Sequence, residues 1–211
     1  MNLIENDVAE FVFQLSGRAP TPGGGGASAL AGALGIALGG MVANLTIGKP
    51  NYANEEDEIK RLKVAAYRVQ KELLGLIQKD ADAFGPLAGA YRMPKSTEEE
   101  KREKERVTDA ALRDAAEAPL SIMERCAEAI ELLEGLAIRG NRLAVSDAGC
   151  GVILAKAAMQ SAWLNVTVNT VSIKDAAYAE RLNDKGRALL DEYLPRADKL
   201  YARVEKGFER S

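Results

Sequence analysis

The chain has 211 residues, 47% of them hydrophobic, and a formal net charge of -3. This length and composition exclude a wholly disordered chain and suffice for one substantial buried core. The small negative charge, with basic and acidic residues intermixed, excludes the electrostatic footprint of a nucleic-acid-binding protein.

The N-terminal stretch predicts a short amphipathic helix. Residues 3–15 carry apolar side chains at helical spacing, and Ser16-Gly17 and two prolines follow them. The stretch lacks the basic region and apolar segment of a secretory signal, and Cys126 and Cys150 are expected to be buried free thiols. We therefore expect a cytoplasmic protein.

The stretch 20–50 is the one around which the rest of the chain is organised. From Ala27 onward, small residues recur every fourth position: Ala27, Ala31, Gly35, Gly39 and Ala43. Each glycine weakens an isolated helix by about 1 kcal/mol relative to alanine, so neighbouring helices must hold this one in place. The missing side chains allow those helices to approach closely. We predict a buried central helix and an all-α bundle of long helices around it.

Two other interpretations of this stretch carry less weight. The run is near the length of a membrane span, but it consists of Ala and Gly, contains Asn44 and Thr46, and lacks an upstream basic cluster, so we expect no membrane. The four glycines 23–26 could cradle an anion with their backbone N–H groups. No phosphate-loop pattern and no preceding strand accompany them, and a flexible turn is the commoner meaning.

Apolar periodicity predicts four more helices, over residues 55–84, 98–139, 143–170 and 174–208. Glycine and proline predict a loop over 85–95. Pro119 either kinks or divides the second of these helices, and Pro195 is expected to kink the last. The segment LNVTVNTVSI favours a strand by propensity alone, but we interpret it as helix. Without repeats or long linkers, we expect one domain, 1–211.

The run EEEKREKER, residues 98–106, follows Ser96 and Thr97 and combines a helix cap with mixed charge. We interpret it as a solvated helix face. Lys104→Ala, within this run, is accordingly expected to have a near-neutral effect on stability.

Asp80 is the first candidate for chemistry, because the chain has no histidine to act as a base or a metal ligand. It falls on the apolar line of its helix, whereas Asp82 turns to roughly the opposite side. A buried carboxylate needs a partner or has its pKa raised, which makes Asp80 a candidate acid, base or cation stabiliser. Periodicity alone slightly favours a structural salt bridge or a cap.

A second polar set lies in the 143–170 helix. Asp147 could be no more than a cap. If the helix already includes it, Asn165 lies about five turns further on at the same azimuth, with Ser161 and Asn169 close by. These residues either line a cleft or join helices by hydrogen bonds, and the pattern leaves the two alternatives equal.

The predicted loop 85–95 gathers Tyr91, Arg92 and Lys95 around a proline. These side chains could grip carboxylates or bring an ammonium group to a transition state. Exposed lysines after proline are common, so the loop alone carries little weight.

Five segments, in order, together resemble the cyclodeaminase family: PTPGGGGASALAGALGIALGGMVANLTIGK, DADAF, AYRMPK with TEEE, SDAGCGV and LNVTVN. This family includes the folate-processing domain of formimidoyltransferase-cyclodeaminase and stand-alone bacterial relatives such as methenyltetrahydrofolate cyclohydrolases. The resemblance runs from about residue 11 to the C-terminal helix. The set of motifs is specific, although each piece alone is not.

The resemblance implies an all-helical homodimer with the substrate site near the subunit interface, acting on a one-carbon tetrahydrofolate without metal, nucleotide or other cofactor. It implies catalytic roles for Asp80, Asp147 and Lys95. The resemblance and the residue patterns above together suggest these substrate-binding residues: Gly23, Gly24, Gly25, Asn44, Lys49, Tyr91, Arg92, Asn165 and Asn169. Gly26 stands where the family usually has serine, which puts a hydroxyl role there in doubt.

The activity that the resemblance implies first is formimidoyltetrahydrofolate cyclodeamination, which closes the 5,10-methenyl ring and expels ammonia. The alternative is methenyltetrahydrofolate cyclohydrolysis, which opens the same cation to the 10-formyl compound. A carboxylate in a water-poor cleft can stabilise that cation and move the proton in either reaction. A non-catalytic folate-binding or scaffold protein is a further alternative, and a small membrane-associated helical protein rests on the Gly/Ala run alone.

Overall fold

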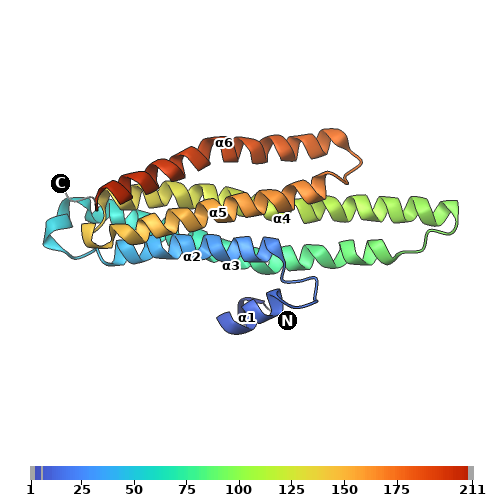
Figure 1. Cartoon of the computed structure of the whole chain (residues 1–211), viewed down its shortest axis with the longest axis horizontal. Helices are drawn as coiled ribbons and strands as arrows, with labels where there is room; N and C mark the ends of the chain where they lie inside the picture. The colour runs from blue at the N-terminus through green and yellow to red at the C-terminus, as the bar shows by residue number, and fades with distance from the viewer. Residues whose placement is uncertain (1–2, 6, 209–211) are drawn as a thin grey trace.

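The structure, a computed structural model, describes residues 3–5 and 7–208. Long helices form an elongated bundle: α2 (Gly24–Asn44), α3 (Glu56–Arg92), α4 (Glu98–Arg139), α5 (Val145–Thr170) and α6 (Ala176–Lys206) (Figure 1). The short helix α1 (Val8–Leu15) and the 3-10 turns η1 (Leu3–Glu5), η2 (Pro50–Glu55) and η3 (Arg142–Ala144) complete the described elements. Since these residues contain no strand, the all-α prediction is confirmed.

Helix α2 is the central element, as the sequence predicts. It packs against α3, α4 and α5, and its Ile36 and Val42 are fully buried. At Gly35 an added Cβ would lie 2.7 Å from the carbonyl oxygen of Gly151, so the α2 and α5 backbones touch where both residues are glycine. A Cβ added to Gly39 would likewise lie 3.0 Å from the Leu133 side chain of α4. Close packing against neighbouring helices thus compensates for the low helix propensity of glycine.

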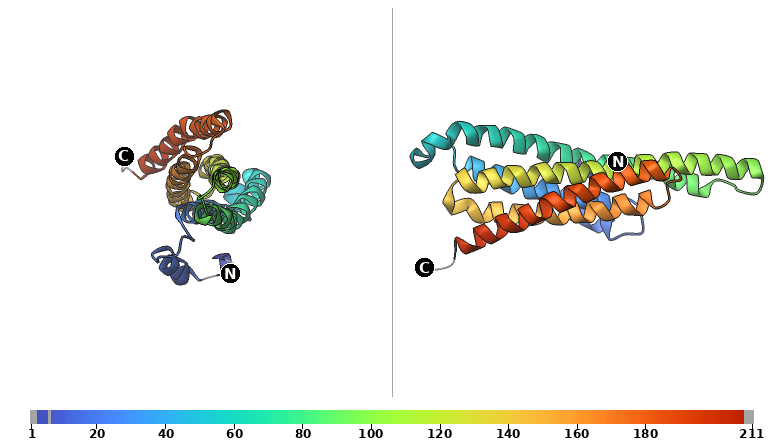
Figure 2. Two further views of the ribbon diagram at one scale, coloured as in Figure 1. Left: turned by 90° about the vertical axis from the view of Figure 1, so that its right-hand side faces the viewer. Right: turned by 90° about the horizontal axis from the view of Figure 1, so that it is seen from above.

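Among the described helices, only α2 is long and apolar enough to cross a membrane, by length and composition. In the bundle 56% of its most apolar window is buried by neighbouring helices. α6 lies on the outer side of α4 and α5, away from α2 and α3 (Figure 2). The buried face of α2 therefore serves as the core of the bundle.

Helix α3 continues through Gly85 and Pro86 to Arg92, so the predicted loop is wrong for residues 85–92. Pro86 removes one backbone donor, yet Leu87 and Ala90 beyond it are 3% and 2% exposed and continue the apolar face. Burial of that face outweighs the lost hydrogen bond. α3 and the start of α4 consequently extend as a two-helix arm past the other helices (Figure 1).

Helices α4, α5 and α6 largely match their predicted ranges. α4 begins with a capping box between Thr97 and Glu100 and runs unbroken through the buried Pro119. α5 includes the β-branched segment near its end, which confirms the helical interpretation. α6 continues through Pro195. Both cysteines are free thiols, but only Cys126 on α4 is buried, so the expectation of burial is wrong for the exposed Cys150 on α5.

The N-terminal prediction is partly wrong. Residues 3–15 form two short pieces, because the Asp7 side chain accepts the Glu10 N–H and starts α1 there. Of the described residues 3–5 and 7–15, only Leu3 and Phe11 are buried, while Val8 is 76% exposed and Phe13 74% exposed. α1 stands apart from the bundle (Figures 1 and 2).

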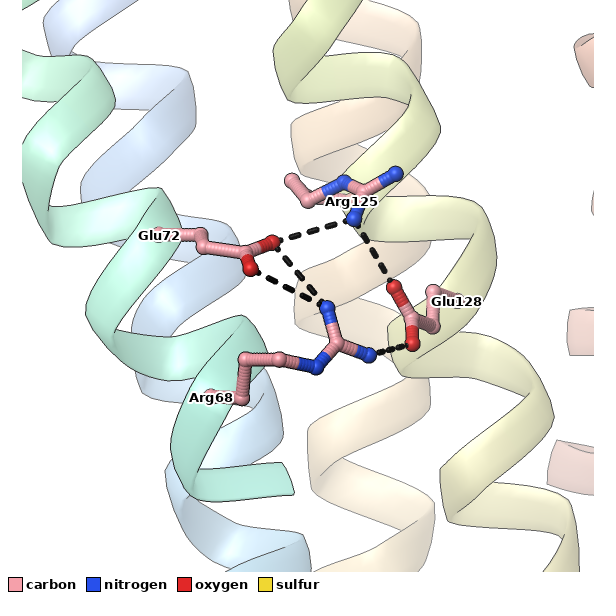
Figure 3. Close-up of polar contacts among 4 residues, drawn as sticks. All are labelled: Arg68, Glu72, Arg125 and Glu128. Atoms are coloured by element: carbon pink, nitrogen blue, oxygen red, sulfur yellow. Dashed lines mark hydrogen bonds and ion pairs between the residues drawn. The ribbon is translucent and has the colours of Figure 1, made fainter. Parts of the chain in front are cut away.

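A network of alternating charges joins α3 to α4 on the bundle surface (Figure 3). Arg125 binds Glu72 and Glu128, each at 3.0 Å, and Arg68 binds Glu72 at 3.1 Å and also pairs with Glu128. These side chains remain partly exposed, so each pair contributes at most about 1 kcal/mol. The network aligns the two helices rather than forming a site.

The charge run at the start of α4 is not wholly a solvated face. Lys104 Nζ donates to the backbone carbonyl oxygens of Tyr91 at 2.7 Å and Met93 at 2.9 Å. This lysine thereby caps the carbonyl end of α3. The near-neutral expectation for Lys104→Ala is replaced by an expected loss of order in the α3–α4 connection.

Candidate active site

A cavity of about 200 Å³ opens at the N-terminal end of α2, where α2, α3, α4 and α5 meet. We call it the Asp80 pocket; its lining residues are Pro20, Thr21, Gly23, Gly24, Gly25, Asp80, Phe84, Ala115, Asn165, Val168 and Asn169. The sequence-derived candidates Gly23, Gly24, Gly25, Asp80, Asn165 and Asn169 are thus brought together by the fold.

The glycines at the start of α2 make room for the Asp80 carboxylate. A Cβ added to Gly25 would overlap both carboxylate oxygens of Asp80. The carboxylate also accepts a hydrogen bond from the Gly26 backbone N–H. The glycine run is therefore more than a flexible turn, because it forms a cradle in which backbone donors of a helix N-terminus face a side-chain carboxylate.

Burial raises the pKa of Asp80 above its ordinary value of 3.8, and the Gly26 N–H only partly opposes that rise. No lysine or arginine pairs with Asp80 within residues 7–208. The structural salt bridge that periodicity allowed is therefore wrong, whereas the cap is partly correct, since Asp80 does accept a first-turn N–H of α2. A cationic group that enters the pocket would therefore pair with the ionised Asp80 carboxylate.

The sequence left open whether the polar residues of α5 line a cleft or join helices, and the two asparagines of the pocket differ in this respect. Asn169 joins helices, because its Nδ2 donates to the Ala115 carbonyl of α4 at 2.9 Å. Asn165 Nδ2 donates to the Ser161 carbonyl within α5, and its amide lies beside Gly24, where an added Cβ would be 3.2 Å from it. Asn165 thus presents its amide at the cradle, while Asn169 both fastens α5 to α4 and lines the pocket.

The remaining motif positions lie elsewhere in the same protomer. Asp147 is inside the first turn of α5, whose N-cap is Ala144, so the cap interpretation of Asp147 is wrong. It lies about 27 Å along the helix from Asn165. Asn44 ends α2, about 30 Å from Gly24, and lines a different cavity; Lys49 follows it. Within one copy these three residues do not reach the Asp80 pocket.

Tyr91 and Lys95 also lie outside the Asp80 pocket. They line a neighbouring cavity of about 300 Å³ between the end of α3 and the start of α4. Arg92 is the last residue of α3 and is exposed. Lys95 therefore does not line the pocket that holds Asp80.

Several residues of these cavities escaped the sequence analysis. Phe84, one turn after Asp80, was not singled out, although a side chain four positions on shares the helix surface of Asp80. Lys101 and Lys174 line the neighbouring cavity but had no signal beyond charge.

Gly26 and Ser28 can now be placed. Ser28 donates to the Gly24 carbonyl at 2.6 Å and is 2% exposed, so it does not replace the family's serine in the pocket. A Cβ at Gly26 would make only ordinary 3.7 Å contacts with Ile77 and Pro22, so the backbone would accept a side chain there. Among the described residues, no group of three or more His, Cys, Asp or Glu side chains could hold a metal ion.

Comparison with known proteins identifies the lineage of this arrangement. The family model described as formiminotransferase-cyclodeaminase matches residues 7–188. The chain belongs to the formiminotransferase-cyclodeaminase family. This membership confirms the resemblance on which the motif assignments rest.

Three proteins of the formiminotransferase-cyclodeaminase family are similar to this chain. A methenyltetrahydrofolate cyclohydrolase of Methylorubrum extorquens is 40% identical, over 94% of this chain and 95% of that protein. The formimidoyltransferase-cyclodeaminase of Rattus norvegicus is 29% identical, over 90% of this chain but only 35% of that protein. The crystal structure of the formiminotetrahydrofolate cyclodeaminase of Thermotoga maritima has a TM-score of 0.81 and 31% identity, covering 96% of this chain and 95% of that one.

Proposed function

We propose that the chain is a one-carbon tetrahydrofolate enzyme whose reaction is the hydrolysis of 5,10-methenyltetrahydrofolate to the 10-formyl compound. The observation that carries an enzymatic role is Asp80, a half-buried carboxylate of raised pKa with no basic partner among the described residues, set in a glycine cradle. Such a carboxylate is suited to a cationic substrate, because a nearby cation stabilises the ionised carboxylate, which burial destabilises.

The choice of hydrolysis rests on the higher sequence identity of the cyclohydrolase relative, since the Thermotoga maritima cyclodeaminase is also matched over 95% of its length, but at 31% identity. The cyclohydrolase relative is 40% identical and is matched over 95% of its length, whereas the rat cyclodeaminase is 29% identical and is matched over 35%. This reverses the order in which the sequence alone ranked the two activities.

In the proposed reaction, water adds to the methenyl carbon between N5 and N10. One proton leaves the water as the C–O bond forms, and the positive charge on the amidinium group is neutralised. The bond from that carbon to N5 then breaks and N5 takes up a proton. The hydroxyl group on the carbon loses its remaining proton as the C=O bond forms, so the carbon stays on N10 as a formyl group and one proton is released overall. Asp80 accepts the proton from water and returns one to N5. The Asn165 amide and the free N–H groups of the cradle orient water and substrate.

Cyclodeamination is the second candidate, favoured by the 0.81 TM-score to the Thermotoga maritima cyclodeaminase. There N10 attacks the formimidoyl carbon, the C–N bond to the departing nitrogen breaks, and ammonia leaves after that nitrogen is protonated. The product is the same methenyl cation. Asp80 would stabilise it and relay the proton, so one arrangement of residues serves both reactions, with no cofactor beyond the folate substrate.

An absorbance assay distinguishes these candidates, since only the methenyl compound has the extended amidinium chromophore. Loss of the methenyl signal above the uncatalysed rate supports hydrolysis. Formation of that signal from the formimidoyl substrate, with ammonia released in equal amount, supports cyclodeamination. Binding of a folate without turnover of either substrate would support the scaffold alternative, although a pocket with a carboxylate and two amides is more polar than a scaffold requires.

We also propose that the enzyme is a homodimer joined through the flank of α2 and α5. Large apolar side chains are exposed there: Leu34 (53%), Met41 (47%), Leu164 (66%) and Val168 (63%). Val168 also lines the Asp80 pocket, so this face borders the site. A second copy is the route by which Asp147, Asn44 and Lys49 could approach an Asp80 pocket. Sedimentation should give a dimer at micromolar concentration, and a stable monomer would contradict the proposal.

A further inference from the structure

Three prolines lie inside helices in the described part of the chain, and they differ in burial. Pro86 in α3 and Pro195 in α6 are exposed, whereas Pro119 in α4 is buried. A proline has no backbone N–H, so the carbonyl four residues earlier loses its usual helical donor. The two exposed prolines free the carbonyls of Asp82 and Asp191, which are exposed residues that water can reach. A buried carbonyl instead needs a donor from the protein.

The carbonyl that Pro119 frees belongs to Ala115, which lines the Asp80 pocket. Ala115 is 7% exposed, and its carbonyl oxygen accepts a hydrogen bond from Asn169 Nδ2 of α5 at 2.9 Å. The side chain of Asn169 therefore takes the place of the N–H that Pro119 lacks. The proline inside α4 and the asparagine that lines the pocket are two parts of one contact between α4 and α5.

The second N–H of the Asn169 amide fixes the orientation of that side chain. The same Nδ2 donates to the Asn165 backbone carbonyl at 2.9 Å. Both amide protons are thus bound to carbonyl oxygens, one on α4 and one on α5. Turning the amide over would place its own oxygen against two acceptors and lose both bonds. The turn of α5 that contains Asn165 is consequently held to a defined point on α4.

The position of the Asn165 side chain depends on this contact. Its amide lies beside Gly24 of the cradle, 3.2 Å from where an added Cβ would be. Within the described residues its Nδ2 donates only to the Ser161 carbonyl of its own helix. The glycine contact between α2 and α5 at Gly35 lies about 16 Å further along α2. Near the pocket, the Asn169 contact therefore sets where α5 presents the Asn165 amide.

We propose that Pro119 and Asn169 are a positioning pair for the reaction in the Asp80 pocket. The carbonyl that Pro119 leaves free lets Asn169 hold α5 where the Asn165 amide faces the glycine cradle. This inference rests on the proposed function. Asn169 acts through Asn165 and not on the substrate, and Pro119 acts through Asn169. Displacing a group that orients water or substrate by a fraction of an ångström is enough to slow the chemical step.

The first test is a double-mutant cycle on turnover. Asn169→Ala should lower kcat about five- to twentyfold, because the Asn165 amide loses its placement, while KM changes less than about threefold. In an Asn165→Ala enzyme, which already lacks that amide, adding Asn169→Ala should lower kcat by less than about twofold. Equal losses of kcat in the two backgrounds would show that Asn169 acts independently of Asn165 and would overturn the proposal.

Pro119→Ala separates positioning from simple structural support. The N–H that it restores can bond to the Ala115 carbonyl, which then no longer depends on Asn169. Asn169→Ala should therefore lower the melting temperature by about a few degrees in the wild type but much less in the Pro119→Ala background. The loss of kcat should persist in that background, because a backbone N–H of α4 cannot hold α5. Recovery of kcat together with melting temperature would make Asn169 a structural support only.

Thr170→Val is the matched control, because Thr170 follows Asn169 and also joins α5 to another helix. Its hydroxyl donates to Asn183 Oδ1 of α6 at 2.9 Å, and it does not line the Asp80 pocket. We expect a lower melting temperature with kcat within about twofold of the wild type. A loss of kcat as large as that of Asn169→Ala would show that any weakening of α5 slows turnover, which would overturn the specific role of Asn169.

These kinetics also distinguish failure of the positioning pair from failure of the proposed function. If the wild type turns over neither the methenyl nor the formimidoyl substrate, the proposed function is wrong and the positioning role falls with it. If the wild type turns over one of them and the losses from Asn165→Ala and Asn169→Ala are additive, the proposed function stands and the positioning pair alone is wrong.

Discussion

The two halves of α2 use glycine for different purposes. In the middle of the helix, Gly32, Gly35 and Gly39 face sulfur, backbone and leucine atoms of the neighbouring helices, and their missing side chains let those helices close together. In the first turn, Gly24 and Gly25 face the Asn165 amide and the Asp80 carboxylate. The same residue type thus builds a core in one half and a site in the other, and the groups across from it decide which.

The largest expected effect comes from breaking the site half alone. Gly25→Ala places a methyl group where the Asp80 carboxylate lies, so the carboxylate must leave the cradle. We expect kcat/KM to fall about 100-fold or more, which corresponds to about 2.7 kcal/mol of transition-state stabilisation. Steady-state kinetics and circular dichroism would measure the loss and show that the fold persists.

Gly75→Ala is the matched control for that change. Gly75 is in the interior of α3, and a Cβ there meets nothing within 4 Å. Activity should be retained, and stability should rise by up to about 1 kcal/mol. A Gly25→Ala enzyme as active as Gly75→Ala would show that the cradle has no catalytic importance.

Breaking the core half should reduce stability rather than chemistry. Gly35→Leu inserts a side chain where α2 and α5 touch, and we expect an overpacking cost of about 1–3 kcal/mol. Thermal or urea unfolding measures it, with Gly40→Ala as the control because a Cβ at Gly40 meets nothing within 4 Å. An unchanged melting temperature and oligomer size would contradict the close-packed crossing.

A smaller effect follows from the raised pKa of Asp80. Because the folded state binds this proton more tightly than the unfolded state, the ionised carboxylate destabilises the fold above its folded pKa. That cost falls as the pH drops through the folded pKa and is gone below the ordinary value of 3.8. Asp80→Asn should therefore melt a few degrees above the wild type at pH 7, with the difference narrowing in acid. A lower melting temperature at pH 7 would identify Asp80 as a stabilising cap.

The smallest effect is expected at Asp82, only two positions away. Its carboxylate is exposed and accepts a single hydrogen bond, from Gln78 Nε2 at 2.7 Å. Asp82→Asn should change stability by less than about 0.5 kcal/mol and leave turnover at the wild-type level. A large loss of turnover would move the catalytic surface to the other side of α3.

Periodicity was enough to predict the bundle, its central helix and the inward side of Asp80, because each depends on which residues share a helical face. It could not predict that α3 passes through Pro86, since the burial of Leu87 and Ala90 that holds the helix together is a tertiary effect. Similarly, α1 has helical spacing but only Phe11 finds a partner surface.

The site was harder to predict than the fold, for a reason visible in α5. A shared azimuth places Asp147 and Asn165 on one stripe, but the length of the helix separates them, and only the packing of α2 and α3 against one end selects Asn165. The overlap of Gly25 with Asp80 depends on how two helices cross, which neither helix encodes alone. The neighbouring cavity that contains Tyr91 and Lys95 likewise required the end of α3, the start of α4 and the segment after α5 to be placed together.

The central claim is that the Asp80 carboxylate performs chemistry instead of merely capping α2, and the turnover of Asp80→Asn tests it most directly. The amide keeps the size and can still accept the Gly26 N–H, so folding and folate affinity should be retained. We predict that kcat for the methenyl or formimidoyl substrate falls by about 10²–10⁴-fold, while the folate dissociation constant changes far less. A folded Asp80→Asn enzyme with wild-type kcat would contradict the account.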